Sequence, residues 1–392
     1  MKRLAVLGST GFIGTATLDV AARFPEKFSV VALAAGRNVK RLAEQVRKWR
    51  PRMVAVAEET DAAVLRAEFP ALEVLAGPEG RDAVAIHPDA TTVVAAFVGA
   101  VGLVPTWRAL TLGREVALAN KETLVAAGEL VMAAAAASGG RVLPIDSEHN
   151  ALHQALRVGP QDAVRRLILT ASGGPFRTLS EQDMAAVTVE QALAHPTWRM
   201  GAKITIDSAT MMNKGLEIIE AHHLFGARED QIAVVVHPES RVHSLVEYGD
   251  GTLIAQLSVN DMRFPILYAL SYPERLPSPF GFLDLVEVGS LHFAQADERR
   301  FPCLRLAREA LRAGGTVPAV LNAANEVSVA AFLAGRLRFT GIPAVVEAAI
   351  ARETSGAHSL AVMGDALAAD ERGRAWAGEL VAKYASSIAG SP

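Results

Sequence analysis

Short apolar runs alternate with amphipathic stretches along the first third of the chain. Most of the runs are rich in Val, Ile and Ala and lack polar alternation, so they predict strands that are covered on both faces. They span residues 4–7, 30–35, 54–57, 93–98, 115–119 and 142–145. Helical patterns such as 13–24 and 39–49 separate them. This alternation is typical of an α/β fold with a doubly wound parallel sheet.

The pattern changes after about Asp146. Residues 165–170 predict another buried strand, whereas 241–248 and 252–259 flank Gly249-Asp250-Gly251 and predict an antiparallel hairpin. Residues 272–302 are rich in proline and predict a linker. The remaining chain predicts helices only, over 304–311, 319–334, 345–351 and 374–385.

These changes divide the chain into four parts. The first, 1–145, is a predicted α/β domain, and 146–271 is a predicted α+β domain. The linker covers 272–302, and 303–392 form a C-terminal helical bundle. A chain of 392 residues is long enough for several domains with buried cores.

Composition excludes several classes of protein. Hydrophobic residues make up 51%, charged residues 21%, and the net charge is −3, which gives no basic footprint for nucleic acid. The uncharged run 90–107 is shorter than the ~20 apolar residues that span a bilayer, and the apolar run 4–7 is too short for a leader peptide. Cys303 is the single cysteine, so we expect no disulfide within a chain and a cytoplasmic location.

A glycine-rich turn follows the first predicted strand. Gly8, Gly11 and Gly14 have the spacing G-x-x-G-x-x-G and precede the first predicted helix. Glycines there permit a tight turn and let backbone N–H groups approach a pyrophosphate at the helix N-terminus. The motif is weak alone, but the strand before it and the helix after it predict a Rossmann-like dinucleotide site.

The end of the second predicted strand bears on the choice of dinucleotide. An NAD enzyme usually has Asp or Glu there, whereas this chain has Gly36-Arg37-Asn38. A guanidinium suits a 2′-phosphate, so NADP is favoured. A solvated surface arginine is the alternative interpretation of Arg37.

Two other oxidoreductase types fit poorly. The tyrosine-lysine pair of short-chain dehydrogenases is absent, because no tyrosine in the sequence is followed by lysine four residues later. A cysteine nucleophile of the aldehyde dehydrogenase type would have to be Cys303, which lies in the predicted helical tail.

Acidic residues follow the sixth predicted strand. Asp146-Ser147-Glu148 stand at its carboxyl end, where ligands bind in sheets of this kind. These residues also suit an ordinary helix start, and taken alone they favour it. If the chain is still extended there, Asp146 and Glu148 point to the same side.

A second polar cluster strengthens the case for a ligand site. Ser208, Asn213 and Lys214 lie near a predicted helix start and suit a phosphate, and Ser172-Gly173-Gly174 can add backbone donors. Glu217 supplies a third carboxylate, and three carboxylates without cysteine favour Mg²⁺ or Mn²⁺.

Histidine pairs offer an alternative metal site. His149 and His153, or His222-His223, have the right types of side chain for zinc. Structural histidines with satisfied hydrogen bonds are the favoured interpretation, and Glu217 itself also fits plain amphipathic packing.

The segment 195–201 predicts a loop with one large aromatic, Trp198. A flap carrying Trp198 would exclude water from a hydride transfer. A tryptophan that anchors the loop to the core is the comparable alternative.

Seven motifs occur in an order that resembles the 1-deoxy-D-xylulose 5-phosphate reductoisomerase family. They are GSTGFIG, ALANKETLV, PIDSEHNA, SGGPF, HPTWRMG, DSATMMNKGLE and NAANEV. The resemblance implies conversion of 1-deoxy-D-xylulose 5-phosphate and NADPH to 2-C-methyl-D-erythritol 4-phosphate. It also implies one divalent cation and a homodimer.

The resemblance also implies roles for individual residues. The metal ligands would be Asp146, Glu148 and Glu217. The substrate would contact Lys121, Ser147, Glu148, Ser172, His195, Trp198, Ser208, Asn213, Lys214 and Glu217, of which Lys121 and His195 join the three acids as catalytic residues. NADPH would contact Thr10, Gly11, Phe12, Ile13, Gly36, Arg37, Asn38, Asn120, Glu122 and Gly201. The family commonly has Ser in place of Phe12 and Lys in place of Arg37.

Two other functional classes remain open at this point. One is a different NADP-dependent oxidoreductase on the same fold. The other is a nucleotide-sensing protein without catalysis, which would have little use for three acids beside a phosphate loop.

Overall fold

The computed structural model describes residues 1–198, 200–356 and 359–389. Contacts divide the chain into two compact units. Unit 1 comprises Met1–Thr123, Val131–Asn150 and Asp261–Phe282, and unit 2 comprises Leu124–Leu130, Ala151–Asn260 and the chain from Leu283 onward.

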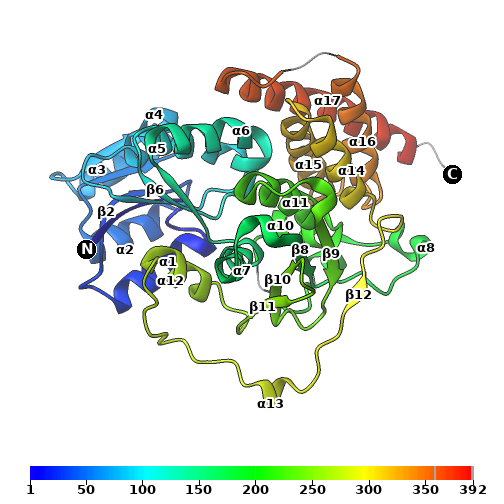
Figure 1. Cartoon of the computed structure of the whole chain (residues 1–392). Coiled ribbons are helices and arrows are strands. Elements are labelled where there is room, and N and C mark those ends of the chain that lie inside the picture. Colours follow the sequence, from blue (N-terminus) through cyan, green and yellow to red (C-terminus); the bar gives the residue numbers. More distant parts are fainter. Residues whose placement is uncertain (199, 357–358, 390–392) are drawn as a thin grey trace. The chain divides into compact units, whose positions relative to one another are not determined.

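Unit 1 contains a seven-stranded parallel sheet in the order β4-β3-β2-β1-β5-β6-β7 (Figure 1). The strands are β1 (Lys2–Leu7), β2 (Phe28–Ala34), β3 (Met53–Val56), β4 (Glu73–Ala76), β5 (Thr92–Ala95), β6 (Glu115–Leu118) and β7 (Arg141–Pro144). Six of them confirm the predicted strands. The sequence analysis missed β4, a four-residue edge strand of which only Val74 is buried.

Helices connect the parallel strands, as a doubly wound sheet requires. They are α1 (Phe12–Arg23), α2 (Val39–Trp49), α3 (Glu59–Glu68), α4 (Gly77–Ala85), α5 (Leu103–Thr111) and α6 (Lys121–Ser138). Helix α6 is interrupted at Ala127, and α7 (Ser147–Ala155) follows β7. The strand order reverses between β1 and β5, which is where such sheets bind dinucleotides.

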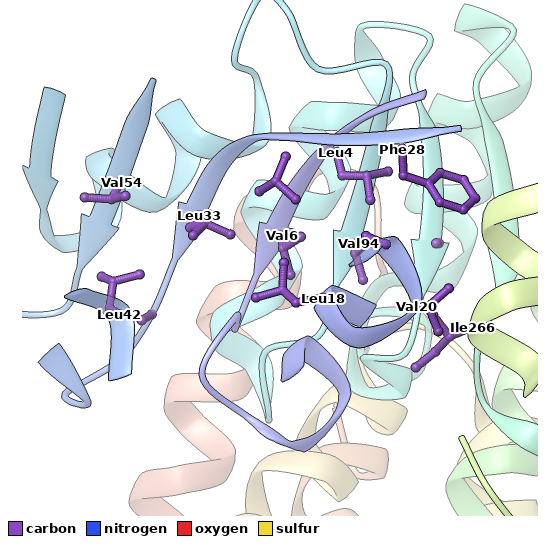
Figure 2. Close-up of a cluster of buried hydrophobic side chains, with 14 of the residues drawn as sticks. Leu4, Val6, Leu18, Val20, Phe28, Leu33, Leu42, Val54, Val94 and Ile266 are labelled. Atoms are coloured by element: carbon purple, nitrogen blue, oxygen red, sulfur yellow. The ribbon is translucent and has the colours of Figure 1, made fainter. Parts of the chain in front are cut away.

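A late segment of the chain completes the core of unit 1. Helix α12 (Arg263–Ser271) buries Ile266, Leu267 and Leu270 in the same apolar cluster as Leu4 and Val20. Figure 2 shows Ile266 of α12 next to Val20 of α1. The hydropathy of α12 does not show that the chain comes back to unit 1 here, because an apolar helix does not specify which sheet it covers.

Unit 2 contains a five-stranded mixed sheet in the order β11-β10-β8-β9-β12. The strands are β8 (Val164–Ala171), β9 (Ile232–Val236), β10 (Val242–Tyr248), β11 (Leu253–Leu257) and β12 (Ala294–Gln295). The β10–β11 pair confirms the predicted hairpin. Strands β9 and β12 were not predicted, and β12 lies inside the segment expected to be a linker.

Helices form the rest of unit 2 (Figure 1). Short ones are α8 (Glu181–Met184), α9 (Val189–Leu193), α10 (Ala202–Ala209) and α13 (Leu285–Val288); longer ones are α11 (Met212–Phe225), α14 (Pro302–Ala313), α15 (Val317–Leu333), α16 (Gly341–Thr354) and α17 (Met363–Ala389). The last four confirm the predicted C-terminal helices. Among the residues described, no helix is long and apolar enough to cross a membrane.

The position of α12 makes a testable prediction. Ile266 is fully buried, so Ile266→Ala should lower the free energy of unfolding by ~2–5 kcal/mol through lost burial and a residual cavity. Val64→Ala is the control, because Val64 is 57% exposed and should change stability by less than ~0.5 kcal/mol. Chemical denaturation measures both, and equal small effects would contradict the assignment of α12 to this core.

Candidate active site

The glycine turn after β1 allows close backbone approach. Gly8 has a φ of +86°, and a Cβ there would lie 2.4 Å from the carbonyl oxygen of Ala96, just beyond β5. A Cβ on Gly14 would lie 2.2 Å from the carbonyl oxygen of Gly8. The buried side chains of Ser9 and Gln45 hydrogen-bond at 2.8 Å and tie this turn to α2. The sequence therefore folds here into a tight turn that leads into a helix N-terminus.

The other residues predicted for this part of the cofactor site surround that turn. Gly11 is the N-cap of α1 and is exposed, as is about half of the Phe12 side chain. Thr10 and Ile13 are partly buried. The N-terminus of α1 therefore presents backbone donors with little side-chain cover, which suits a pyrophosphate.

Gly36, Arg37 and Asn38 follow β2 and are exposed. The Arg37 side chain is 85% exposed, and its guanidinium lies 3.8 Å from the carboxylate of Glu58. Asn38 accepts a hydrogen bond from the backbone N–H of Arg41 and so caps α2. The cap fixes the backbone beside Arg37, whose guanidinium extends into solvent.

Asn120 and Glu122 follow β6 and are buried. The amide of Asn120 donates to the carbonyl of Gly99 at 3.0 Å and to the Glu122 carboxylate at 2.7 Å. Asn120 therefore connects the segment after β6 to the loop after β5, and Glu122 accepts a hydrogen bond from the same amide.

Asp146 follows β7, and its carboxylate lies 2.6 Å from the ammonium of Lys121. Burial alone would raise the pKa of Asp146, but Lys121 and the neighbouring His149 hold it well below its usual range. The imidazole Nδ1 of His149 lies 3.7 Å from the same carboxylate. The acid is therefore held ionised in a dry environment.

Ser147 and Glu148 form the first turn of α7, so the helix-start interpretation is confirmed. The chain is not extended from Asp146 to Glu148, and the expected alternation of these two carboxylates does not apply. The Ser147 hydroxyl donates to Glu148 at 2.5 Å.

In unit 2, one imidazole links two of the predicted phosphate-binding serines. The Nε2 atom of His195 lies 3.0 Å from the Ser172 hydroxyl and 3.1 Å from the Ser208 hydroxyl. Its Nδ1 accepts hydrogen bonds from the backbone N–H groups of Thr197 and Trp198 at 3.2 and 3.0 Å. We call these three side chains the serine–histidine cluster.

The hydrogen bonds assign the tautomer of His195. Backbone N–H groups only donate, so Nδ1 is the unprotonated nitrogen and Nε2 carries the hydrogen. Burial lowers the pKa of His195, which favours this neutral form. Because Nε2–H donates, the hydroxyls of Ser172 and Ser208 keep their own hydrogens for an anion.

Glycine also shapes the serine–histidine cluster. Gly174 has a φ of +65°, and a Cβ there would lie 2.7 Å from the carbonyl oxygen of Ser208. Any larger residue would separate the 172–174 loop from α10.

Glu217 is fully buried on α11. Asn213 donates to one of its carboxylate oxygens at 2.6 Å, and the Lys214 ammonium lies 2.5 Å from the other. Two residues predicted for phosphate thus contact a residue predicted as a metal ligand.

Trp198 is half-buried, and its ring centroid lies 6.4 Å from that of His243. A half-buried ring in contact with His243 fits both the flap and the anchor interpretation. Of the predicted flap, Gly201 is exposed, and Arg199 lies outside the described residues.

The sequence analysis missed one polar network beside this site. Asp207 on α10 pairs with Lys203 and with Asn325 of α15, and both Asp207 and Asn325 are buried. Asp207 and Lys203 are four residues apart, a spacing from which an ion pair on a helix could have been predicted. Asn325 lies 118 positions away, and no local pattern connects it to Asp207.

The histidine pair on α11 has a structural role. His222 Nδ1 hydrogen-bonds to the carbonyl of Ala227 at 2.8 Å. The ring of His223 packs where a Cβ on Gly128 would lie, 2.2 Å from its nearest atom. Burial, with the neighbouring His222, lowers the pKa of His223 to about 4.

The glycine turn at the β1/β5 switch point and the exposed arginine after β2 are typical of a dinucleotide-dependent oxidoreductase. Three family profiles match the chain in order. They are described as 1-deoxy-D-xylulose 5-phosphate reductoisomerase over residues 4–128, its C-terminal domain over 142–225, and the DXP reductoisomerase C-terminal domain over 257–376. The chain belongs to the 1-deoxy-D-xylulose 5-phosphate reductoisomerase family.

Curated relatives with that name match along the whole chain. The protein from Anaeromyxobacter sp. (strain K) is 54% identical and covers 100% of both chains. The one from Symbiobacterium thermophilum is 56% identical over 87% of this chain and 89% of its own.

Solved structures of enzymes with that name have the same fold as this chain. A DOX-P reductoisomerase in complex with NADPH, fosmidomycin and magnesium has a TM-score of 0.93 at 41% identity, covering 97% of this chain and 98% of that one. The enzyme from Zymomonas mobilis in complex with NADPH has a TM-score of 0.90 at 42% identity, covering 97% and 99%.

The lowered pKa of His223 predicts a pH dependence of stability. The unfolded state, with a histidine pKa near ~6.5, takes up a proton before the folded state does. The stabilising contribution is therefore fully present above that pKa and is lost as the pH falls toward about 4. The free energy of unfolding of His223→Gln should change less over this window than that of the wild type.

Urea denaturation at a series of pH values provides the measurement. Leu112→Ala is the control, because the Leu112 side chain carries no titrating group and is 58% exposed, and it should keep the wild-type slope. Equal slopes for wild type and His223→Gln would contradict the prediction.

Proposed function

We propose that this chain catalyses the NADPH- and divalent-metal-dependent reductive isomerisation of 1-deoxy-D-xylulose 5-phosphate to 2-C-methyl-D-erythritol 4-phosphate, a reaction of non-mevalonate isoprenoid biosynthesis. Full-length relatives at 54–56% identity bear the enzyme's name, and a solved relative holds NADPH, fosmidomycin and magnesium. The observation that carries the proposal is the pair of lysine-paired carboxylates, Asp146 and Glu217, together with the serine–histidine cluster. A protein that only senses a nucleotide would have no use for either feature.

For NADPH, we propose that the pyrophosphate lies over the N-terminus of α1 and that Arg37 holds the 2′-phosphate. The lining residues would be Thr10, Gly11, Phe12, Ile13, Gly36, Arg37, Asn38, Asn120, Glu122 and Gly201. The close approach at Gly8 and the exposed guanidinium of Arg37 support this fit. NADPH, when bound, supplies the hydride.

For the metal, the proposed ligands are Asp146, Glu148 and Glu217. Oxygen donors without thiolate suit Mg²⁺ or Mn²⁺. Asp146, whose pKa Lys121 lowers, and the buried Glu217 beside Lys214 fit this role, because a hard cation would replace these two lysines. A divalent cation in such a site supplies Lewis-acid stabilisation of substrate oxygens.

For the substrate, Ser172, Ser208, Asn213 and Lys214 would hold the phosphate, with the hydroxyl hydrogens of both serines donating to its oxygens. Lys121, Ser147 and His195 would contact the rest of the sugar, and Trp198 would exclude water while the hydride is transferred. Binding energy from the remote phosphate can order these contacts around the reacting carbons.

We further propose a homodimer located in the cytoplasm. The exposed apolar side chains of Leu285, Val286 and Phe293 support self-association. The proposed domains are 1–145 for NADPH, 146–271 for catalysis and 303–392 as a helical domain, joined by 272–302. The contacts modify these bounds, because Asp261–Phe282 pack with unit 1.

The cofactor assignment predicts that Arg37→Asp erodes the preference for NADPH over NADH, because it replaces a phosphate partner with a repelling charge. The ratio of kcat/KM values for the two cofactors should fall by about tenfold or more, as expected for loss of a charge-assisted hydrogen bond. Arg47→Asp changes another exposed arginine, on the far end of α2, and should leave the ratio unchanged. An unchanged ratio in Arg37→Asp would remove Arg37 from the site.

The metal assignment predicts that Glu217→Gln lowers kcat by roughly 100-fold or more, because several kcal/mol of metal-dependent stabilisation depends on its ligands. NADPH binding, measured by fluorescence, should persist. EDTA should abolish wild-type turnover and Mg²⁺ or Mn²⁺ should restore it. Glu353→Gln alters an equally buried carboxylate, on α16, which pairs with Arg372 of α17, and it should keep its turnover per folded molecule. Wild-type activity that survives exhaustive chelation would refute the assignment.

A further inference from the structure

Helix α10 carries a buried charge in an unfavourable place. Asp207 is 1% exposed and lies in the last turn of α10, where the helix dipole disfavours a carboxylate. Its charge is balanced by the ammonium of Lys203 at 2.8 Å, one turn earlier. Because burial of the Asp207 carboxylate costs stability, we expect this residue to have a role other than packing.

The second partner of Asp207 comes from the C-terminal helices. Asn325 on α15 is fully buried, and its amide donates to the other carboxylate oxygen at 2.8 Å. Helices α10 and α15 also pack against each other. The last turn of α10 is therefore held on this side by one directional hydrogen bond.

The residue held in place is Ser208, next in sequence to Asp207. Its hydroxyl lies 3.1 Å from His195 Nε2, and its carbonyl oxygen would lie 2.7 Å from a Cβ on Gly174 of the 172–174 loop. A rotation of the last turn of α10 would move both the hydroxyl and the carbonyl of Ser208. The geometry of the serine–histidine cluster thus depends on how Asp207, in the same turn of α10, is held by Asn325.

We propose that Asp207 and Asn325 are positioning residues for the phosphate subsite: their hydrogen bond fixes the last turn of α10, and with it the Ser208 hydroxyl. Neither residue touches the substrate. The inference rests on the proposed function, because it takes the serine–histidine cluster as the site that receives the substrate phosphate.

Asn325→Leu tests the proposal, because it keeps the approximate volume and removes the donor. The KM for 1-deoxy-D-xylulose 5-phosphate should rise about tenfold, the worth of one well-formed hydrogen bond to a charged phosphate, while the KM for NADPH stays constant. Asn325→Ser folds more readily and is too short to reach Asp207, so it should behave in the same way.

Thr316→Val is the matched control. Thr316 donates to Glu353 at 2.6 Å, and both residues are buried among the same C-terminal helices. Loss of this hydrogen bond should lower the melting temperature, as Asn325→Leu does. It should change neither the KM for 1-deoxy-D-xylulose 5-phosphate nor the KM for NADPH. An Asn325→Leu variant that loses stability but keeps the wild-type KM would overturn the proposal.

A binding measurement separates this inference from the proposed function. Inorganic phosphate should raise the melting temperature of wild type and Thr316→Val, and raise it less for Asn325→Leu. A wild type that binds phosphate but oxidises no NADPH with the sugar phosphate would refute the proposed function, while the loss of the phosphate effect in Asn325→Leu would still support the positioning role. Equal phosphate effects in all three proteins would overturn that role.

Discussion

The candidate site depends on keeping carboxylates charged where little water reaches them. Desolvation of a carboxylate is costly unless a cation or several donors compensate for it. Asp146 has Lys121, Glu217 has Lys214, and Asp207 has Lys203. Removing one member of such a pair typically costs ~3–5 kcal/mol, because an uncompensated charge remains. The lysines therefore stabilise these carboxylates, and two of them, Lys121 and Lys214, are also candidates for binding substrate.

Two of these pairs are local and one is not. Lys214 lies three residues before Glu217 on α11, and Lys203 lies four residues before Asp207 on α10. In both pairs, formation of the helix brings the two charges together. Lys121 and Asp146 follow the neighbouring strands β6 and β7, so their contact requires the parallel sheet to form first. The glycines supply the complementary feature, because Gly8 and Gly174 let two backbones approach where any side chain would separate them.

The same distinction explains what the sequence could predict. Apolar runs identified six strands of the large sheet and the β10–β11 hairpin, and residue chemistry identified the glycine turn, Arg37 and the acids. Edge strands β4 and β12 were missed because four- and two-residue strands that are partly exposed carry little hydrophobic signal. Helix α12 gave no indication of which core it completes, and the Asp207–Asn325 contact joins residues 118 positions apart. Contacts of this kind are set by tertiary packing, which a local pattern does not record.

The central claim is that these paired acids and the dinucleotide turn serve one reductive isomerisation. The most direct test is to incubate the purified chain with 1-deoxy-D-xylulose 5-phosphate, NADPH and Mg²⁺, follow NADPH absorbance, and identify the product by NMR. The account predicts stoichiometric NADPH oxidation with formation of 2-C-methyl-D-erythritol 4-phosphate. NADPH that stays reduced in the presence of folded protein, metal and this substrate, or a product with an unrearranged carbon skeleton, would contradict it.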